Sequence, residues 1–329
     1  MRRNAYYQGP VTDHFDGERF TSPNELPVRP PSAHLRFVAG QVARFRSAPP
    51  RAIPQDRPPA RVDGLRISPI GHSSLLVQVA GLNILIDPVF AEWLGPWAGS
   101  GPRRAHEPGV RWEDLPPIDA VLISHNHWDH LDGPGIARLW HRFRPRIVTP
   151  LGNDAVIRRY DPGITVEALD WGEGMALSDR LWVQVEPAHH WSGRSLLDRR
   201  MALWGSFVLK DASGGVLYHV GDTAYGDGRI FQRIREVHGA PDVALIPIGA
   251  YEPRWYVGGQ HVDPDEAVRI MLDCGAKQAF GHHWGTFQLT WEAVDAPPRE
   301  LEAALGRHKL PPERFRALRP GEPVESPWP

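Results

Sequence analysis

Short apolar runs separated by turn residues begin at Leu65 and continue along most of the chain. Three runs come first: Leu65–Ile70, Ser74–Val79 and Asn83–Ile86. Each run is too short for a typical helix and is bounded by glycine, which favours strands. Because the connections are only a few residues long, the pattern predicts an antiparallel meander.

Further along the chain, strand-like runs alternate with segments that carry apolar residues at helical spacing. The run Ala120–Ile123 predicts a strand, and Ile136, Leu139, Trp140 and Phe143 predict a helix after it. The other expected strands are Arg146–Thr149, Thr165–Leu169, Ala176–Leu177, Leu181–Glu186, Ala202–Leu209, Val216–Val220 and Val243–Ile248. The other expected helices are Asn153–Tyr160, Gly228–Val237, Pro264–Cys274 and Glu300–Arg307. The chain is therefore expected to combine α and β structure (α/β, α+β).

Residues 1–63 differ from the rest by weak periodicity and many prolines. Four aromatic residues offer anchors for this segment: Tyr6, Tyr7, Phe15 and Phe20. They favour an extended arm that wraps the main domain, with a short helix near Leu35–Arg46, over a disordered tail. We expect the main domain to span residues 64–310 and a Pro-rich tail to occupy residues 311–329.

Composition and charge exclude several classes of protein and partner for this chain. The formal net charge is −2 without a run of Lys or Arg, which argues against a nucleic-acid partner. The single cysteine, Cys274, excludes an internal disulfide, and no apolar stretch approaches the roughly 20 residues that span a bilayer. The start of the chain lacks the apolar part of a secretory signal, so we expect a cytoplasmic protein. The 16 His residues fit a metal site, and the 13 Trp residues fit a core, a substrate groove or a membrane-facing surface.

The densest group of metal-binding side chains follows the expected strand Ala120–Ile123. Ligand-type side chains occupy four of six consecutive positions: His125, His127, Asp129 and His130. A turn between a strand and a helix can aim several side chains at one point while its neighbours hold it rigid. A polar loop that bonds only to water and backbone does not need this density of ligands, so we interpret the segment as a metal site.

The spacing in this loop suits two ions. Residues two apart in extended backbone project to the same side, so His125 and His127 can bind one ion. Asp129 and His130 follow a further bend and can face a second ion about 3.5–4 Å away. Two such ions can share a bridging hydroxide as the nucleophile of a hydrolysis. Ligation by His and Asp suits two Zn²⁺ ions, and Mn or Fe would also be tolerated.

Three later segments add candidate ligands, two of them at expected strand ends. Neighbouring strand residues point to opposite faces, so only one of His189 and His190 can reach the metals, and the residues alone leave that choice open. The same holds for His282 and His283. Asp222 follows an apolar strand and a glycine that permits close approach, which suits a carboxylate shared by two ions.

The pattern His-x-His-x-Asp-His at His125–His130 resembles the signature of the metallo-β-lactamase fold superfamily. The longer string around it and the motifs Tyr251–Trp255 and His283–Thr286 are similar to N-acyl-phosphatidylethanolamine-hydrolysing phospholipase D (NAPE-PLD) and its bacterial relatives. The resemblance implies a four-layer αββα sandwich of two facing mixed sheets with an extended N-terminal arm. Its metals would lie at the edge of the two sheets.

The resemblance also implies a ligand set. The first ion would be held by His125, His127 and His190, the second by Asp129, His130 and His283, with Asp222 bridging. His189 would then support a ligand or contact substrate. Asp87 and His72, at strand ends, would hydrogen-bond to ligand side chains, although a turn Asp before a Pro explains Asp87 equally well.

Further roles near the metals follow from the same motifs. Asp129 and His261 are expected to take part in catalysis, His261 by protonating a leaving oxygen or orienting substrate. Arg254 offers a cation for a phosphodiester, and a structural Arg bonded to Glu252 or a carbonyl is an equal alternative. Two further residues, Gln260 and Tyr251, are expected to contact substrate.

The resemblance implies a di-metal hydrolase, most directly a phospholipase D-type phosphodiesterase acting on N-acyl-phosphatidylethanolamine or a related lipid phosphodiester. A lactone, ester or amide hydrolase on the same site is the alternative. A non-catalytic protein that retains metals is disfavoured by the complete ligand set. The expected partner is a small-molecule or lipid substrate. The tryptophans of Glu92–Trp97 suit a lipid-facing or substrate-facing lip or a packed loop, and peripheral contact with the inner membrane face and a homodimer are left open.

Overall fold

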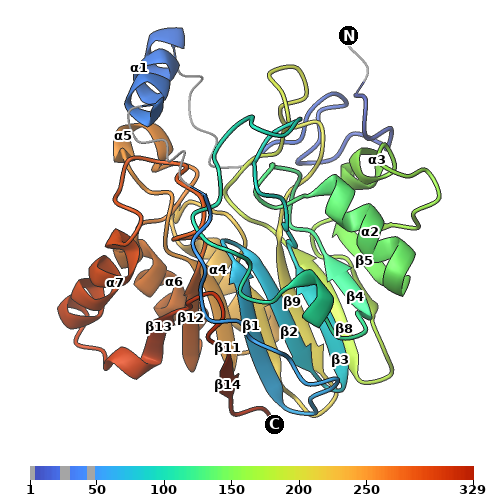
Figure 1. The fold of residues 1–329 in the computed structure, drawn as a ribbon, viewed down its shortest axis with the longest axis vertical. Helices are drawn as coiled ribbons and strands as arrows, with labels where there is room; N and C mark the ends of the chain where they lie inside the picture. The colour runs from blue at the N-terminus through green and yellow to red at the C-terminus, as the bar shows by residue number, and fades with distance from the viewer. Residues whose placement is uncertain (1–3, 23–29, 43–48) are drawn as a thin grey trace.

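Two seven-stranded mixed sheets face each other in the computed structural model, which describes residues 4–22, 30–42 and 49–329 (Figure 1). The first sheet has the order β14-β1-β2-β3-β4-β5-β6. Its strands are β1 (Leu65–Gly71), β2 (Ser74–Val79), β3 (Leu82–Ile86), β4 (Ala120–Leu122), β5 (Arg146–Pro150), β6 (Glu167–Leu169) and β14 (Val324–Ser326). The second sheet has the order β13-β12-β11-β10-β9-β8-β7. Its strands are β7 (Gly174–Ala176), β8 (Leu181–Glu186), β9 (Ser206–Asp211), β10 (Val216–His219), β11 (Val243–Pro247), β12 (Gln278–His282) and β13 (Phe315–Ala317).

Each sheet changes from antiparallel to parallel pairing at one strand. In the first sheet, β1, β2 and β3 form the expected antiparallel meander, and β3 through β6 pair in parallel. In the second, β7 through β10 are antiparallel and β10 through β13 are parallel. Parallel neighbours end at the same edge of a sheet, so the loops after β3, β4, β10 and β12 can meet.

Helices on both outer faces complete the four-layer αββα sandwich, which confirms the expected fold (Figure 1). The α-helices are α1 (Pro31–Val42), α2 (Gly133–Phe143), α3 (Asn153–Ile157), α4 (Arg229–His238), α5 (Arg254–Val257), α6 (Pro264–Cys274) and α7 (Ala296–Arg307). Helices α2 and α3 pack on the first sheet, and α4, α6 and α7 pack over the second. None of the helices in the described part of the chain is long and apolar enough to cross a membrane.

Alternation along β4 explains why its sequence is apolar throughout. Leu122 points into the core between the sheets, where it joins Phe207 and Phe280. Its neighbour Val121 points outward and packs with Leu139 of α2. A strand buried on both faces has no polar position, and each fully buried side chain of this size contributes about 1.5–3 kcal/mol. This packing fixes the end of β4. The loop of residues 123–132 begins there and carries the candidate ligands His125, His127, Asp129 and His130, so we call it the ligand loop.

The C-terminal segment, expected to be a separate Pro-rich tail, contributes one strand to each sheet. Phe315 in β13 pairs with Ala279 of β12 and is buried. Val324 in β14 pairs with Ile67 of β1 and packs against the core. The expected tail was therefore wrong, because edge strands of three residues among prolines show no period that a sequence pattern can reveal.

Other strands and helices begin or end a few residues away from the expected positions. The strand expected at Ala202–Leu209 is Ser206–Asp211, and the helix expected at Asn153–Tyr160 ends at Ile157. The helix expected near Leu35–Arg46 begins at Pro31, and its residues 43–46 lie outside the described part of the chain.

The N-terminal arm packs on the main domain through the expected aromatic residues. Phe15 and Phe20 are buried against Trp204, and the backbone N–H of Phe20 donates to the carbonyl of Arg200 (2.8 Å). The Tyr6 hydroxyl donates to Asp198 Oδ2 (2.6 Å). This places the arm beside the loop between β8 and β9.

Candidate metal centre

Ligand-type side chains converge at the edge where strands of both sheets end. The loop after β4 carries the segment His125–His130, and β8 leads to His190. Asp222 follows β10, and His283 follows β12. The side chains of all seven expected ligands are nearly or fully buried except that of His127, which is half-buried.

Three imidazoles form the first group. His127 Nδ1 lies 2.9 Å from His125 Nε2 and 3.2 Å from His190 Nε2. A cation bonded to imidazole nitrogens at about 2.0–2.1 Å in tetrahedral geometry sets those nitrogens roughly 3.3 Å apart. Both distances are close to this value, and all three ligand atoms lie within 4.8 Å of one another, so the group fits one such ion.

The second group combines two carboxylates and two imidazoles. Asp129 Oδ2 lies 3.5 Å from His130 Nε2 and 3.4 Å from His283 Nε2. Asp222 Oδ2 lies 3.2 Å and 3.1 Å from the same two nitrogens. On its other side, this oxygen is 3.6 Å from His190 Nε2. One carboxylate thus stands between the two groups, where the resemblance places a bridging residue.

The donor atoms of these groups fit metal ions better than they fit one another. His130 Nε2, His283 Nε2 and Asp222 Oδ1 are buried and have no hydrogen-bond partner among the described residues. A buried polar atom left in this state costs about 1–3 kcal/mol. A cation in each group would bond to these atoms and offset their desolvation, so the residues fit a di-metal centre.

Burial and charge set the protonation of the two groups differently. Burial lowers the pKa of His127 to about 4 and holds the pKa values of His125 and His190 well below the usual value. At His283, burial acts in the same direction, but the Asp222 and Asp129 carboxylates outweigh it and raise the pKa to about 9. Neutral imidazoles are ready to bind metal, whereas a protonated His283 must release its proton when a cation binds.

Asp87 fixes the orientation of a ligand histidine. Its Oδ2 lies 2.7 Å from His130 Nδ1 and accepts a hydrogen bond from the Ser124 hydroxyl (2.6 Å). Its Oδ1 accepts the backbone N–H of Ser124 (2.7 Å). The carboxylate therefore contacts an expected ligand and is more than a turn residue before Pro88, and its support of a metal ligand stays a prediction.

His72 supports the second group in the same way. Its Nε2 lies 3.1 Å from Asp129 Oδ2, and its backbone N–H donates to Thr286 Oγ1 (2.6 Å). His72, Asp87 and His283 all adopt positive φ, at 54°, 44° and 63°. Such backbone costs about 1–3 kcal/mol per residue and persists only where the surroundings enforce it. Three of the eight non-glycine residues with positive φ in the described structure thus lie at the candidate site.

The two adjacent histidines after β8 point apart. His190 Nε2 joins the first group, and its Nδ1 lies 2.9 Å from the carbonyl of Gln260. His189 Nδ1 lies 3.4 Å from the hydroxyl of Ser22 in the arm, so His189 does not face the metal groups as a substrate contact would. After β12, His282 stacks on His219, and His283 enters the second group.

His261 stands beside the metal groups. Its Nδ1 lies 3.8 Å from Asp222 Oδ2, and its ring centroid is 5.0 Å from that of His190 and 5.5 Å from that of His283. Burial lowers the pKa of His261 to about 4, which favours the neutral ring. His261 can also form a third ligand group with His190 and Asp222.

Three expected substrate contacts make hydrogen bonds within the protein or lie away from the metal groups. Arg254 donates from Nη2 to Glu266 Oε2 (2.7 Å) and from Nη1 to the carbonyl of His261 (2.8 Å), so its charge is used within the protein. Gln260 Oε1 accepts the indole N–H of Trp191 (2.6 Å). Tyr251 is buried and lines a pocket that contains none of the seven ligands. Arg254 thus makes the contacts of its structural alternative, and a part for any of the three in substrate binding stays a prediction.

Ser124 contacts the candidate site, although the sequence motifs did not assign it a role. Its hydroxyl lies 2.9 Å from His125 Nδ1 while it donates to Asp87. It links the supporting carboxylate to ligands of both groups. The available signal was its position directly before the first ligand.

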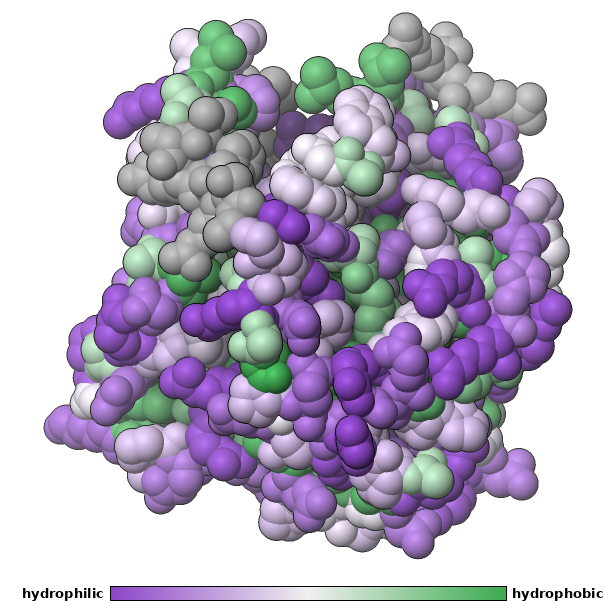
Figure 2. All heavy atoms as spheres, viewed as in Figure 1, coloured by the Kyte–Doolittle hydropathy of each residue, from purple (hydrophilic) through white to green (hydrophobic). Residues whose placement is uncertain are grey.

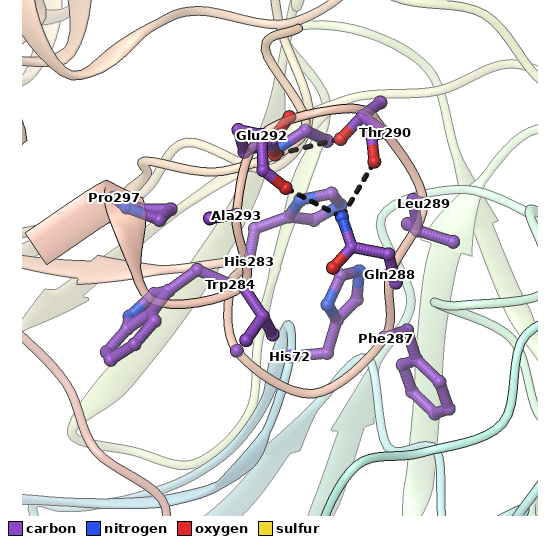
Figure 3. A pocket seen from close by; sticks show the side chains of 13 residues that line it. His72, His283, Trp284, Phe287, Gln288, Leu289, Thr290, Glu292, Ala293 and Pro297 are labelled. Atoms are coloured by element: carbon purple, nitrogen blue, oxygen red, sulfur yellow. Dashed lines mark hydrogen bonds between the residues drawn. The ribbon is translucent and has the colours of Figure 1, made fainter. Parts of the chain in front are cut away.

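His283 and the loop that follows it line a pocket together with His72 (Figure 3). The side-chain amide of Gln288 donates to the carbonyls of Thr290 and Glu292, both at 2.7 Å. The Glu292 carboxylate accepts the backbone N–H of Ala250 (2.7 Å). The loop after β12 is therefore tied to the loop after β11, which limits the movement of His283.

The chain matches the family described as beta-lactamase superfamily domain over residues 82–284. A Caenorhabditis elegans protein named N-acyl-phosphatidylethanolamine-hydrolyzing phospholipase D 1 is 34% identical over 246 residues, which cover 72% of this chain and 68% of the relative. The Saccharomyces cerevisiae mitochondrial enzyme of the same name is 35% identical, covering 71% of this chain and 50% of the yeast protein. An uncharacterized protein of Mycobacterium tuberculosis is 38% identical, covering 82% and 73%.

Solved structures share the fold at lower identity. An isothiocyanate hydrolase from Delia radicum gut bacteria has a TM-score of 0.63 and 21% identity, covering 80% of this chain and 99% of that one. Igni18, a metallo hydrolase from Ignicoccus hospitalis, has a TM-score of 0.58 and 21% identity, covering 79% and 97%.

Proposed function

Because this chain belongs to the metallo-β-lactamase superfamily and is a metal-dependent hydrolase, we propose that it cleaves a lipid phosphodiester as a phospholipase D does. The proposed substrate is N-acyl-phosphatidylethanolamine or a close relative, the lipid in the names of the worm and yeast relatives. The single observation that carries the proposal is the Asp222 carboxylate between two ligand groups. Two ions that share a ligand can face the attacking and leaving oxygens of one phosphodiester.

In the proposed centre the ions would supply the reactive water and positive charge, and the side chains would position the ions and the substrate. Two bound divalent ions would supply a water of lowered pKa and positive charge opposite the phosphoryl oxygens. Asp222 fixes the distance between the two ligand groups. Asp87 orients His130, and His72 orients Asp129. Neutral His261 can donate its ring N–H to an oxygen of the diester and orient it. A catalytic part for Asp129 beyond ligation stays a prediction.

A lipid substrate also needs a surface that meets a bilayer. Exposed apolar side chains occur on α1, on the loop after β3 and on the loop after β8, and hydrophobic atoms are visible over α1 at the upper edge of Figure 2. Leu196 is 93% exposed, Trp97 70% and Leu35 68%. All three segments adjoin the site: α1 bonds to Gln288, the second loop to Thr286 and the third to Asn126. These contacts support a rim that touches lipid, the peripheral membrane contact that the sequence left open.

Replacing Leu196 and Leu197 together with Ser is expected to weaken binding to phosphatidylethanolamine vesicles by about tenfold or more, because each leucine would lose part of a burial free energy of about 1.5–3 kcal/mol. Co-sedimentation with vesicles measures this. Val237→Ser, at a half-exposed apolar position on α4, is the matched control. Unchanged vesicle binding in the double variant would remove the rim from the proposal.

The choice of substrate is tested by assaying the metal-loaded protein on three compounds. We expect release of the N-acylethanolamine from vesicles of N-acyl-phosphatidylethanolamine, slow cleavage of a soluble aryl phosphodiester, and weak turnover of a lactone. Fast lactone turnover with neither diester cleaved would replace the phosphodiesterase by the lactone, ester or amide hydrolase.

A further inference from the structure

Arg194 joins the two ends of the ligand loop. It lies in the loop between β8 and β9, and its Nη1 donates to the carbonyl of Asn126 (3.0 Å) and to that of Leu131 (2.9 Å). Asn126 separates His125 from His127, and Leu131 directly follows His130. One guanidinium nitrogen therefore links backbone positions on either side of His127, Asp129 and His130.

Further contacts fix this guanidinium in place. Its carbon lies 3.5 Å from the centroid of the Trp128 ring, and its Nη2 donates to the Tyr160 hydroxyl (3.1 Å). The indole N–H of Trp128 donates back to the Arg194 carbonyl (3.2 Å). The Asp198 carboxylate accepts the backbone N–H groups of Arg194 and Ser195, which holds the loop that presents the side chain.

The ligand loop has little hydrogen bonding of its own. In the described structure, its internal backbone bonds run from the N–H groups of His130 and Leu131 to the carbonyl of His127, at 3.2 Å and 2.9 Å. These bonds close the turn that carries Asp129, but they leave the Asn126 carbonyl to Arg194. A planar guanidinium can bridge two carbonyls and stack on an indole at once, which a lysine ammonium cannot reproduce.

We propose that Arg194 is a positioning residue that sets the relative placement of the first and second metal groups. It touches the backbone and Trp128 of the ligand loop, and so acts on the ions through His127, Asp129 and His130. The inference goes beyond the proposed function, because it holds whichever ester the protein hydrolyses.

The test compares Arg194→Ala and Arg194→Lys with Arg199→Ala. Arg199 lies on the same loop and also stacks on a tryptophan, Trp191 (4.7 Å), but makes no hydrogen bond to the ligand loop in the described structure. Each variant is loaded with Co²⁺, and three properties are read: the visible spectrum, the magnetic coupling between the ions, and the chelator concentration that removes half the metal. Near-UV circular dichroism checks the fold.

We expect Arg194→Ala to lose metal at a chelator concentration at least tenfold lower than the parent protein does, and to show an altered visible spectrum and magnetic coupling. Millimolar methylguanidinium should restore all three properties. Arg194→Lys should recover only part of the chelator resistance that Arg194→Ala loses. Arg199→Ala should match the parent protein in chelator resistance, spectrum and coupling. A folded Arg194→Ala or Arg194→Lys protein with parental spectrum, coupling and chelator resistance would overturn the proposal, as would an equal loss in Arg199→Ala. If Arg194→Ala does not fold, the comparison of Arg194→Lys with Arg199→Ala decides in the same terms.

Discussion

Replacing Asp222 with Ala is expected to abolish hydrolysis and to lower metal content while the protein stays folded. Asp222 Oδ2 lies 3.1–3.2 Å from two nitrogens of the second group and 3.6 Å from His190 in the first, so one substitution removes a ligand from both. We expect turnover to fall about a thousandfold or more, a barrier increase of roughly 4 kcal/mol. Metal content by mass spectrometry and initial rates with saturating Zn²⁺ measure the effect.

The fold should survive because Asp222 lies at a strand end and Oδ1 has no hydrogen-bond partner among the described residues. Asp227→Ala is the matched control: Asp227 is an exposed carboxylate in the same loop that pairs with Arg229 and lies outside the ligand groups. Full activity with two retained ions in Asp222→Ala would contradict the shared-carboxylate centre.

Replacing His261 with Ala is expected to lower turnover by about 10²–10³-fold with both ions retained, within the usual range for a group that assists proton transfer or orients a reacting oxygen. His261 Nδ1 is 3.8 Å from Asp222 Oδ2, close enough to reach a substrate held there. Rates with saturating metal, together with metal content, separate this role from ligation.

His261→Gln keeps a side-chain N–H donor and should recover part of the lost rate if orientation is the role. Loss of one ion in His261→Ala would instead assign His261 to the third ligand group, with His190 and Asp222. Parental activity in both variants would leave His261 without a part in the reaction.

Local features of the sequence predicted the strands and the ligand-rich loop, and the resemblance supplied the four layers and the full ligand set. An apolar run such as Ala120–Ile123 identifies a buried strand, and the dense ligand spacing after it identifies the loop. The choice of His190 and His283 came from the resemblance, and the structure places both in the groups. Strand geometry alone states that neighbours diverge but not which one faces the metals.

Contacts between distant segments were beyond the reach of the sequence. Arg254 binds Glu266 and the carbonyl of His261, and nothing in the local motif shows that its charge is already paired. The strand at Val324–Ser326 exists because β1 offers an open edge, which local propensity cannot show. Arg194 lies outside every metal motif, and its bonds to two carbonyls more than 60 positions away become visible only in the fold.

Anomalous diffraction at the metal absorption edge, on crystals of the purified protein, tests the central claim most directly. We predict two peaks about 3.5–4 Å apart, one among His125, His127 and His190 and one among Asp129, His130 and His283, with Asp222 in contact with both. A single peak, or a pair that Asp222 does not join, would contradict the di-metal centre.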